Sequence, residues 1–260
     1  MPRASVRVER SVIRLGEPIA GVVEGDRVYA VFSVWMASTL LTRGEAIPSA
    51  RLLYKESFWL EPGRFEIRYP RGLPPTISTR AHKVRWSITF GVPRLGGRIL
   101  FPRSTLRIKV LPPIPEEIET DLGWLVLNSR RFHPDDELLG RIKVEGVAPE
   151  DVTAELVVRE WLEVDGDRRE YTWTLAPGDS GTLAGETAIR VELPHDPTVP
   201  KDLFFFYPYT FSADFGGIRF GTETYLVVTL PEGVKEVPLP ISPRLPRFEP
   251  TKEKRGPPLW

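Results

Sequence analysis

The 260-residue chain has no cysteine and no glutamine, and Asn128 is its only asparagine. The absence of thiols excludes disulfides, thiolate chemistry and any metal site built on sulfur. Depletion of thermolabile amide side chains, together with 27 prolines, is typical of proteins from thermophiles. We therefore expect a thermophilic source.

The chain also lacks a charge excess and long apolar runs. Its 35 basic residues balance its 35 acidic residues, which predicts no bulk attraction to nucleic acid or anionic membranes, although local patches can still form. Residues 1–10 are charged and lack the apolar segment of a signal peptide. No stretch approaches the ~20 apolar residues of a membrane span. We expect a cytoplasmic protein without an integral membrane segment.

The chain does contain an internal repeat. Residues 65–70 and 189–194, 124 positions apart, both alternate bulky apolar with charged side chains and end at a proline. This alternation is typical of a strand with one buried face. Further blocks recur in the same order at offsets of 119 or 124: residues 16–21 with 135–140, 28–32 with 152–156, and 105–112 with 224–231. Their order and nearly constant offset predict a duplicated domain of roughly 120 residues.

Short strand patterns dominate both halves of the chain. Residues 82–90 alternate apolar and polar side chains, and Asp165-Gly166-Asp167 predicts a hairpin turn between two strands. No stretch longer than about ten residues has helical periodicity with caps, and strands at this spacing favour sandwiches. We predict an all-β fold of two tandem antiparallel immunoglobulin-like β-sandwiches. The predicted domains are residues 1–115 and 116–237, followed by an extended proline-rich tail over 238–260.

No residue set points to catalysis or to a metal. His82 begins an alternating strand, where a structural role is expected. His133 and His195 each stand next to aspartate and proline in turn sequences, where those residues serve the backbone. We find no nucleophile motif, phosphate loop or metal-ligand spacing. The sequence therefore predicts a protein that is not an enzyme and has no cofactor or metal.

Two apolar features are candidates for binding a partner. In residues 203–211 one face of the expected strand suits the core, which leaves Phe204 and Phe206 on the other face. Either a loop or the other domain covers that face, or it forms an exposed patch for a partner. The tail ends in Leu259 and Trp260, which can anchor it along a sandwich edge; a solvated tail is the alternative. The candidate partner-binding residues are thus Phe204, Phe206, Leu259 and Trp260.

The order and duplication of three motifs resemble the arrestin fold family. The motifs lie at residues 16–21, 65–75 and 84–88, and their degenerate copies lie at 135–140, 189–200 and 207–211. With the thermophile-like composition, the prokaryotic branch, which includes archaeal and bacterial sporulation-control proteins, is the most similar. The resemblance implies a non-enzymatic adaptor that binds protein partners through loops, strand edges and the interdomain groove. The phosphate-sensing positions of animal arrestins are not recognisable in this sequence.

Two functions of different classes follow. The first is an intracellular adaptor or scaffold that binds protein partners and no nucleic acid, and for which peripheral membrane association through a partner is possible. The alternative is a small-molecule- or carbohydrate-binding β-sandwich, for which Trp35, Trp59, Trp161 and Trp173 could supply an aromatic surface. An enzyme is the third possibility, and no catalytic set supports it.

Overall fold

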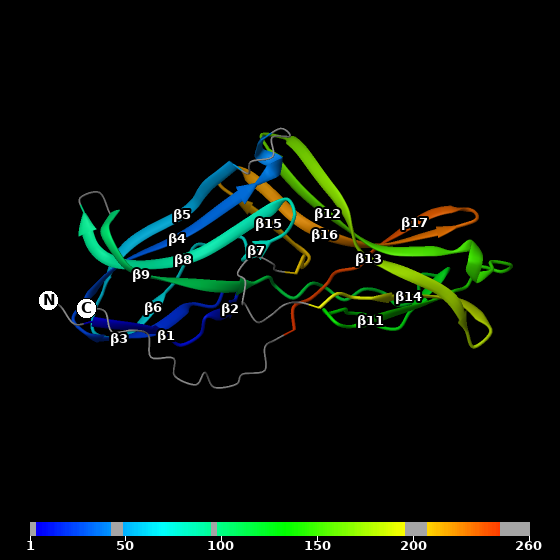
Figure 1. Ribbon diagram of the computed structural model, residues 1–260, viewed down its shortest axis with the longest axis horizontal. Helices are drawn as coiled ribbons and strands as arrows, with labels where there is room; N and C mark the ends of the chain where they lie inside the picture. The colour runs from blue at the N-terminus through cyan, green and yellow to red at the C-terminus, as the bar shows by residue number, and fades with distance from the viewer. Residues whose placement is uncertain (1–3, 43–48, 95–97, 196–206, 245–260) are drawn as a thin grey trace.

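The computed structural model describes residues 4–42, 49–94, 98–195 and 207–244, and the regular elements of this part are strands and two short 3-10 helices (Figure 1). The first domain contains β1 to β9 and a 3-10 helix: β1 Ala4–Val8, β2 Val12–Arg14, β3 Ile19–Gly25, β4 Val28–Ser38, η1 Thr39–Thr42, β5 Ser49–Leu60, β6 Gly63–Ile67, β7 Ile77–Ser78, β8 His82–Arg94 and β9 Arg98–Leu111. The second domain contains the remaining elements: β10 Leu125–Leu127, β11 Glu137–Ile142, η2 Pro149–Asp151, β12 Thr153–Val164, β13 Asp167–Leu183, β14 Glu186–Glu192, β15 Phe211–Phe215, β16 Ile218–Leu230 and β17 Gly233–Pro238.

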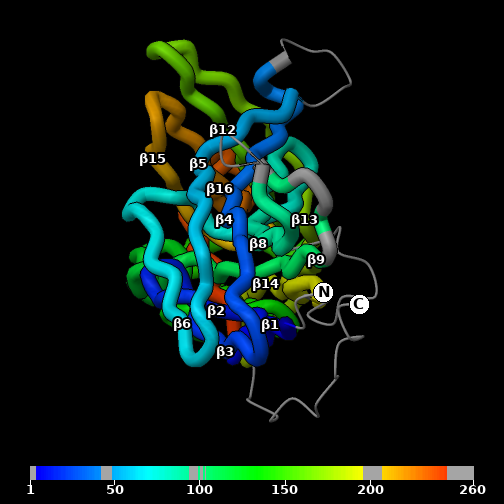
Figure 2. Tube along the Cα trace, turned by 90° about the vertical axis from the view of Figure 1, so that its left-hand side faces the viewer, coloured from blue at the N-terminus to red at the C-terminus, as the bar shows by residue number. Residues whose placement is uncertain are grey.

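The first domain is a sandwich of two sheets. One sheet has the order β1-β3-β6, and the other has the order β2-β9-β8-β4-β5, with β7 paired to the start of β8. Figure 2, viewed from the end of this domain, shows β5, β4, β8 and β9 side by side. The alternation predicted for residues 82–90 is confirmed, because Val84, Trp86, Ile88 and Phe90 are all buried between the sheets.

The second domain has the same two layers, but one strand joins them. The sheet order is β10-β11-β14-β13-β12-β16-β15, with β17 also on β16. The first part of β13 pairs with β12, and its last part pairs with β14, the change occurring at Gly178. The strand β13 therefore continues through the glycine-containing residues 177–183. The predicted turn at Asp165-Gly166 is confirmed, and both residues have positive φ values of 53° and 81°.

The repeated turn motif has the same geometry in both domains. Gly16 and Asp135, at equivalent positions, both have positive φ, 96° and 65°. Five residues further on, Gly21 lies opposite Phe65, and Gly140 lies opposite Ile189. Side chains at both glycines would collide with those opposite residues. The two sandwiches are thus built from the same strand pairing, as the sequence repeat predicts.

The last block of the predicted repeat was aligned wrongly. Val110 donates its N–H to the Thr76 hydroxyl, and its carbonyl accepts from the Thr76 N–H. Ile241 makes the same two bonds with Thr210. The end of β9 therefore corresponds to the segment after β17, and β8 corresponds to β16. The sequence match of 105–112 to 224–231 fails because strand alternation has a period of two, so any even shift matches equally well.

This correspondence changes the interpretation of two further segments. Residues 207–210 form no strand, and Tyr207, Pro208 and Tyr209 are buried in succession before β15 begins at Phe211, so the alternating strand predicted over 203–211 is wrong for its described part. Leu239 and Ile241, at the start of the predicted tail, are completely buried in the second domain's core. The packed chain continues at least to Ser242.

The first domain's core includes residues from the second half of the chain. Leu162 of β12, Phe211 and Ala213 of β15, and Ile218 and Phe220 of β16 all belong to the same buried cluster as Phe32, Trp86 and Ile108. These strands extend past their own sandwich and close the end of the other one (Figure 1). The two domains therefore share apolar packing.

Candidate functional site

The four residues predicted to bind a partner, Phe204, Phe206, Leu259 and Trp260, lie outside the described residues. Within the described part, two polar groupings stand out. One joins the domains, and we call it the junction network: Ser38, Thr79 to His82, Glu160, Trp161 and Trp173. The other surrounds the turn at Asp135 in the second domain.

Glu160 is the centre of the junction network. Its side chain is completely buried, and it accepts hydrogen bonds from the backbone N–H groups of Arg80 at 3.1 Å and Ala81 at 2.9 Å. It also accepts from the Thr79 hydroxyl and, at 2.7 Å, from the indole N–H of Trp173. A buried carboxylate is costly unless its oxygens are satisfied. Here four donors satisfy it, and three of them come from the other domain.

His82 completes the network from the first domain. Its Nε2 donates to the carbonyl of Trp161 at 3.1 Å, so Nδ1 is the acceptor for the Ser38 hydroxyl at 3.0 Å. Burial lowers the pKa of His82 to about 4, while the hydrogen bond to the Trp161 carbonyl opposes that shift. The imidazole is therefore neutral near pH 7, and its role is structural, as its place at the start of a strand predicted.

Two contacts at the margin reinforce this junction. Arg169 of β13 donates to the carbonyl of Leu40 in η1 at 2.8 Å, and the guanidinium of Arg80 lies 4.4 Å from the ring centre of Trp173. Together with the shared apolar cluster, these contacts fix the domains against each other. The network thus acts as a structural joint between the two domains.

The role of Glu160 was not predicted from the sequence, although a signal was present. Ala154, Leu156, Val158 and Leu162 occupy the buried face of β12, and Glu160 falls on the same face. An acidic residue at an inward position of an apolar strand requires donors from elsewhere in the fold. That register was readable from the sequence, but the donors from residues 79–81, about 80 positions away, were not.

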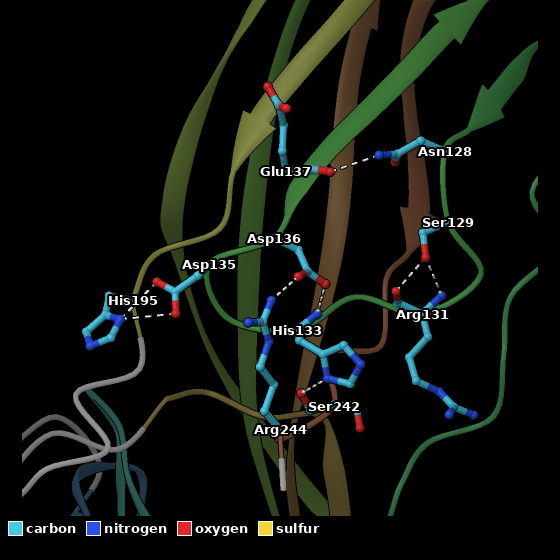
Figure 3. A network of polar contacts seen from close by, with 10 residues as sticks. All are labelled: Asn128, Ser129, Arg131, His133, Asp135, Asp136, Glu137, His195, Ser242 and Arg244. Carbon is cyan, nitrogen blue, oxygen red and sulfur yellow. Dashed lines mark hydrogen bonds and ion pairs between the residues drawn. The ribbon is translucent and has the colours of Figure 1, made fainter. Parts of the chain in front are cut away.

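The second grouping is the network of polar contacts around the turn at Asp135 (Figure 3). It lies beside an open polar pocket of about 450 Å³. Basic side chains contact its carboxylates. Asp135 contacts His195 Nδ1 at 2.9 Å, Asp136 pairs with Arg244, and Arg190 lies between Glu137 and Glu192. Within the described residues, no group of three or more histidine, aspartate or glutamate side chains is arranged to hold a metal ion.

The contacts of His133 show what this grouping does. Its backbone N–H donates to Asp136 at 2.8 Å, closing the turn, and its Nδ1 donates to the carbonyl of Ser242 at 2.9 Å (Figure 3). The Ser242 N–H in turn donates to the Phe132 carbonyl. The network therefore holds the segment after β17 against the turn, which supports the structural interpretation of these histidines.

The four tryptophans proposed for a carbohydrate surface have different environments. Trp161 is buried, and Trp173 is tied to Glu160. Trp35 and Trp59 are exposed on the first domain, where Arg27 covers the Trp59 ring at 4.6 Å. The polar pocket has no tryptophan, tyrosine or phenylalanine in its lining. These residues therefore do not form one shared aromatic site.

Comparison with known proteins places the fold. No protein-family model matches the sequence, and no curated protein matches it significantly. Among solved structures, the chain is similar to squid arrestin, with a TM-score of 0.54 and 9% sequence identity, over 95% of this chain and 96% of the squid protein. At this low sequence identity, the similarity shows a shared fold and nothing about function. In the described residues, no helix is long and apolar enough to cross a membrane. The chain has an arrestin-like fold of two tandem β-sandwiches.

Proposed function

We propose that this chain is a non-enzymatic adaptor that binds a protein partner in the cytoplasm of a thermophilic archaeon. The observation that carries the proposal is the arrestin-like arrangement of two sandwiches over nearly the whole chain. The junction network adds support, because it builds one rigid body without a reactive group facing solvent. A rigid body with exposed strand edges suits recognition better than turnover.

The edge strand β5 is the surface within the described residues that best fits a partner segment. β5 runs for 12 residues and pairs with β4 on one side, at the outer end of its sheet. Most of its residues are exposed or half-buried. An extended peptide can add to such an edge through backbone hydrogen bonds. Phe204, Phe206, Leu259 and Trp260 remain proposed additional contacts.

Affinity capture with the immobilised full-length chain, from a lysate of its source organism, tests the proposal. We expect the chain to retain one discrete protein partner. After purification, that partner should bind the purified chain again. The edge is tested with Lys55→Pro, because a proline in β5 interferes with backbone pairing along that edge and Lys55 is not a core residue. A second variant, Phe204→Ser with Phe206→Ser, tests the aromatic pair.

The matched control for the edge variant is Thr89→Pro on β8, a half-buried position that is paired with Val31 of β4 on one side and with Thr105 of β9 on the other. This control should destabilise the protein strongly, whereas Lys55→Pro, in a strand paired on one side, should lower the melting temperature less and should weaken binding of the partner. A chain that retains no protein, or that turns over a small molecule from the same lysate, would contradict the adaptor proposal.

A further inference from the structure

The free side of β5 has a regular stretch that can accept another strand. Residues 54–60 pair one to one with residues 28–34 of β4, and the register shifts at Leu53, which ends the regular stretch. Within the described residues, β5 pairs with no strand other than β4. Its other side therefore offers backbone N–H and carbonyl groups to an added strand. We call residues 54–60 the open edge.

The apolar core is not closed at the open edge. Tyr54, Glu56 and Phe58 are on the inner face of the sheet, since each lies opposite a fully buried residue of β4. Even so, Glu56 is exposed, and Tyr54 and Phe58, which pack against the core, are only half-buried. Lys55 and Trp59 alternate with them on the outer face, and both are exposed. An added strand would therefore bury apolar surface on both faces.

Two adjacent charges of opposite sign occupy the middle of the open edge. Lys55 and Glu56 are both exposed, one on each face. Glu56 accepts a hydrogen bond from the Tyr54 hydroxyl at 2.8 Å. Within the described part of the chain, no basic side chain contacts Glu56 and no acidic side chain contacts Lys55. A strand that adds here places its own side chains opposite these two charges, where opposite charges attract and like charges repel.

The strand at the same place in the second domain compensates its own charges. Within the described residues, the first part of β13 also pairs on one side only, with β12. Its charged residues pair along the strand: Arg168 contacts Glu170 at 2.7 Å, and Arg169 contacts Asp167 at 2.7 Å. The duplicated architecture therefore does not require uncompensated charges on this edge. They are a property of the side chains of β5.

A second copy of the chain would leave these charges uncompensated. When two identical strands pair antiparallel about a twofold axis, residues that face each other lie on the same side of the joined sheet. Lys55 and Glu56 lie on opposite sides, so the lysine of one copy never faces the glutamate of the other. A register centred on either charge places like charges against each other, which destabilises the pair. A register centred on Ser57 gives neither charge a counter-charge. The charges therefore favour a different occupant.

We propose that the open edge binds an extended segment of a partner protein in which a basic residue is followed directly by an acidic residue, with apolar residues on both sides of this pair. The segment runs antiparallel to β5, as β4 does on the other side. Its basic residue faces Glu56 and its acidic residue faces Lys55. Its apolar residues face Phe58 and Trp59 at one end and Tyr54 at the other. This inference rests on the adaptor function proposed above and names the kind of segment that the edge selects.

Two peptides of identical composition, with blocked ends and a fluorescent label, test the proposal by fluorescence polarisation with the full-length chain. The first is Thr-Val-Val-Thr-Lys-Glu-Val-Thr, and the second exchanges its lysine and glutamate. The first peptide should bind about tenfold more tightly, because the exchange turns two attractive cross-strand pairs into two repulsive ones. The double variant Lys55→Glu with Glu56→Lys should reverse this preference by a similar factor, so that the second peptide binds more tightly.

The matched control exchanges charges on the corresponding edge of the second domain, in the double variant Arg168→Glu with Glu170→Arg. It should keep the peptide preference of the unmodified chain, and both double variants should melt close to it because the exchanged side chains lie on the surface. Equal affinity for the two peptides, or binding of neither, would overturn the proposal. Lys55 and Glu56 would then serve only to keep other strands from pairing with β5.

A second measurement separates this inference from the adaptor function. The Lys55→Glu, Glu56→Lys variant should fail to capture the partner that the unmodified chain retains from the lysate. If the variant captures the same partner equally well, the adaptor function stands and the assignment of its binding segment to the open edge is wrong.

Discussion

At the scale of single residues, the carboxylate of Glu160 is the most heavily hydrogen-bonded side chain of the junction network. Glu160→Gln keeps the shape but turns an amide donor toward donors that need an acceptor. We expect a loss of about 2–3 kcal/mol in the free energy of unfolding. Glu155→Gln, on the opposite face of β12, is the control and should cost less than about 0.5 kcal/mol. If both variants lose the same free energy of unfolding in urea, the hydrogen bonds to buried Glu160 do not stabilise the protein as proposed.

His82 predicts how stability depends on pH. Its pKa is about 4 in the folded protein and 6.5 as the ordinary value, so the unfolded chain binds the proton more readily. The contribution of neutral, buried His82 to the free energy of unfolding is therefore complete above about pH 6.5 and is lost as the pH falls toward 4. The loss amounts to about 3 kcal/mol. His82→Gln should flatten this part of the stability profile, and an unchanged slope between pH 6.5 and 4 would contradict the assignment.

At the scale of elements, the paired glycines of β3 and β11 set how closely neighbouring strands approach. A Cβ at Gly21 would lie 2.4 Å from the backbone oxygen of Arg7, whereas one at Gly140 would meet side-chain atoms of Leu125 and Ile189 at 2.8 and 2.9 Å. Backbone moves less easily than side chains. Gly21→Ala should thus destabilise the protein by about 3 kcal/mol and Gly140→Ala by about 1 kcal/mol. Gly181→Ala, with open space around it, is the control for calorimetry and should be nearly neutral.

The segment after β17 gives a prediction about truncation. Leu239 and Ile241 are completely buried, and burying each contributes about 2–3 kcal/mol. A chain that ends at Arg244 should melt as the full-length chain does. A chain that ends at Pro238 should lose about 4–6 kcal/mol, which is comparable to the stability of a whole domain. Thermal unfolding of the two chains distinguishes these outcomes, and equal melting temperatures would contradict the packing.

How much of these elements the sequence predicts depends on whether the signal is local. The strand at 82–90 and the turn at Asp165 follow from alternation and turn chemistry in adjacent residues, and the duplicated turn follows from the matched glycines and acidic residues. The register of β16 does not follow, because its alternation matches β9 as well as β8. The partners of Glu160 do not follow either, since they are fixed only when two distant segments meet.

At the scale of the whole molecule, the shared apolar cluster predicts that both domains unfold together. Leu162, from the second domain, is 2% exposed within the core of the first. Leu162→Ala should lower the free energy of unfolding by about 2–5 kcal/mol and should leave a single calorimetric transition. The fragment 1–115 should bind a hydrophobic dye, because its core lacks five buried residues from the second half. Two separate transitions in the full-length chain would contradict this coupling.

The same shared cluster determines the order in which the protein matures during synthesis. Phe220 must leave the ribosome before the core around Trp86 is complete, although every strand of the first domain is made by Leu111. The amino-terminal sandwich therefore keeps apolar surface exposed while roughly half of the chain is still being translated. In many multidomain proteins, by contrast, the first domain folds as soon as it has emerged. A nascent chain of this kind needs protection by chaperones over that interval, and stalled translation between the two halves leaves an aggregation-prone intermediate.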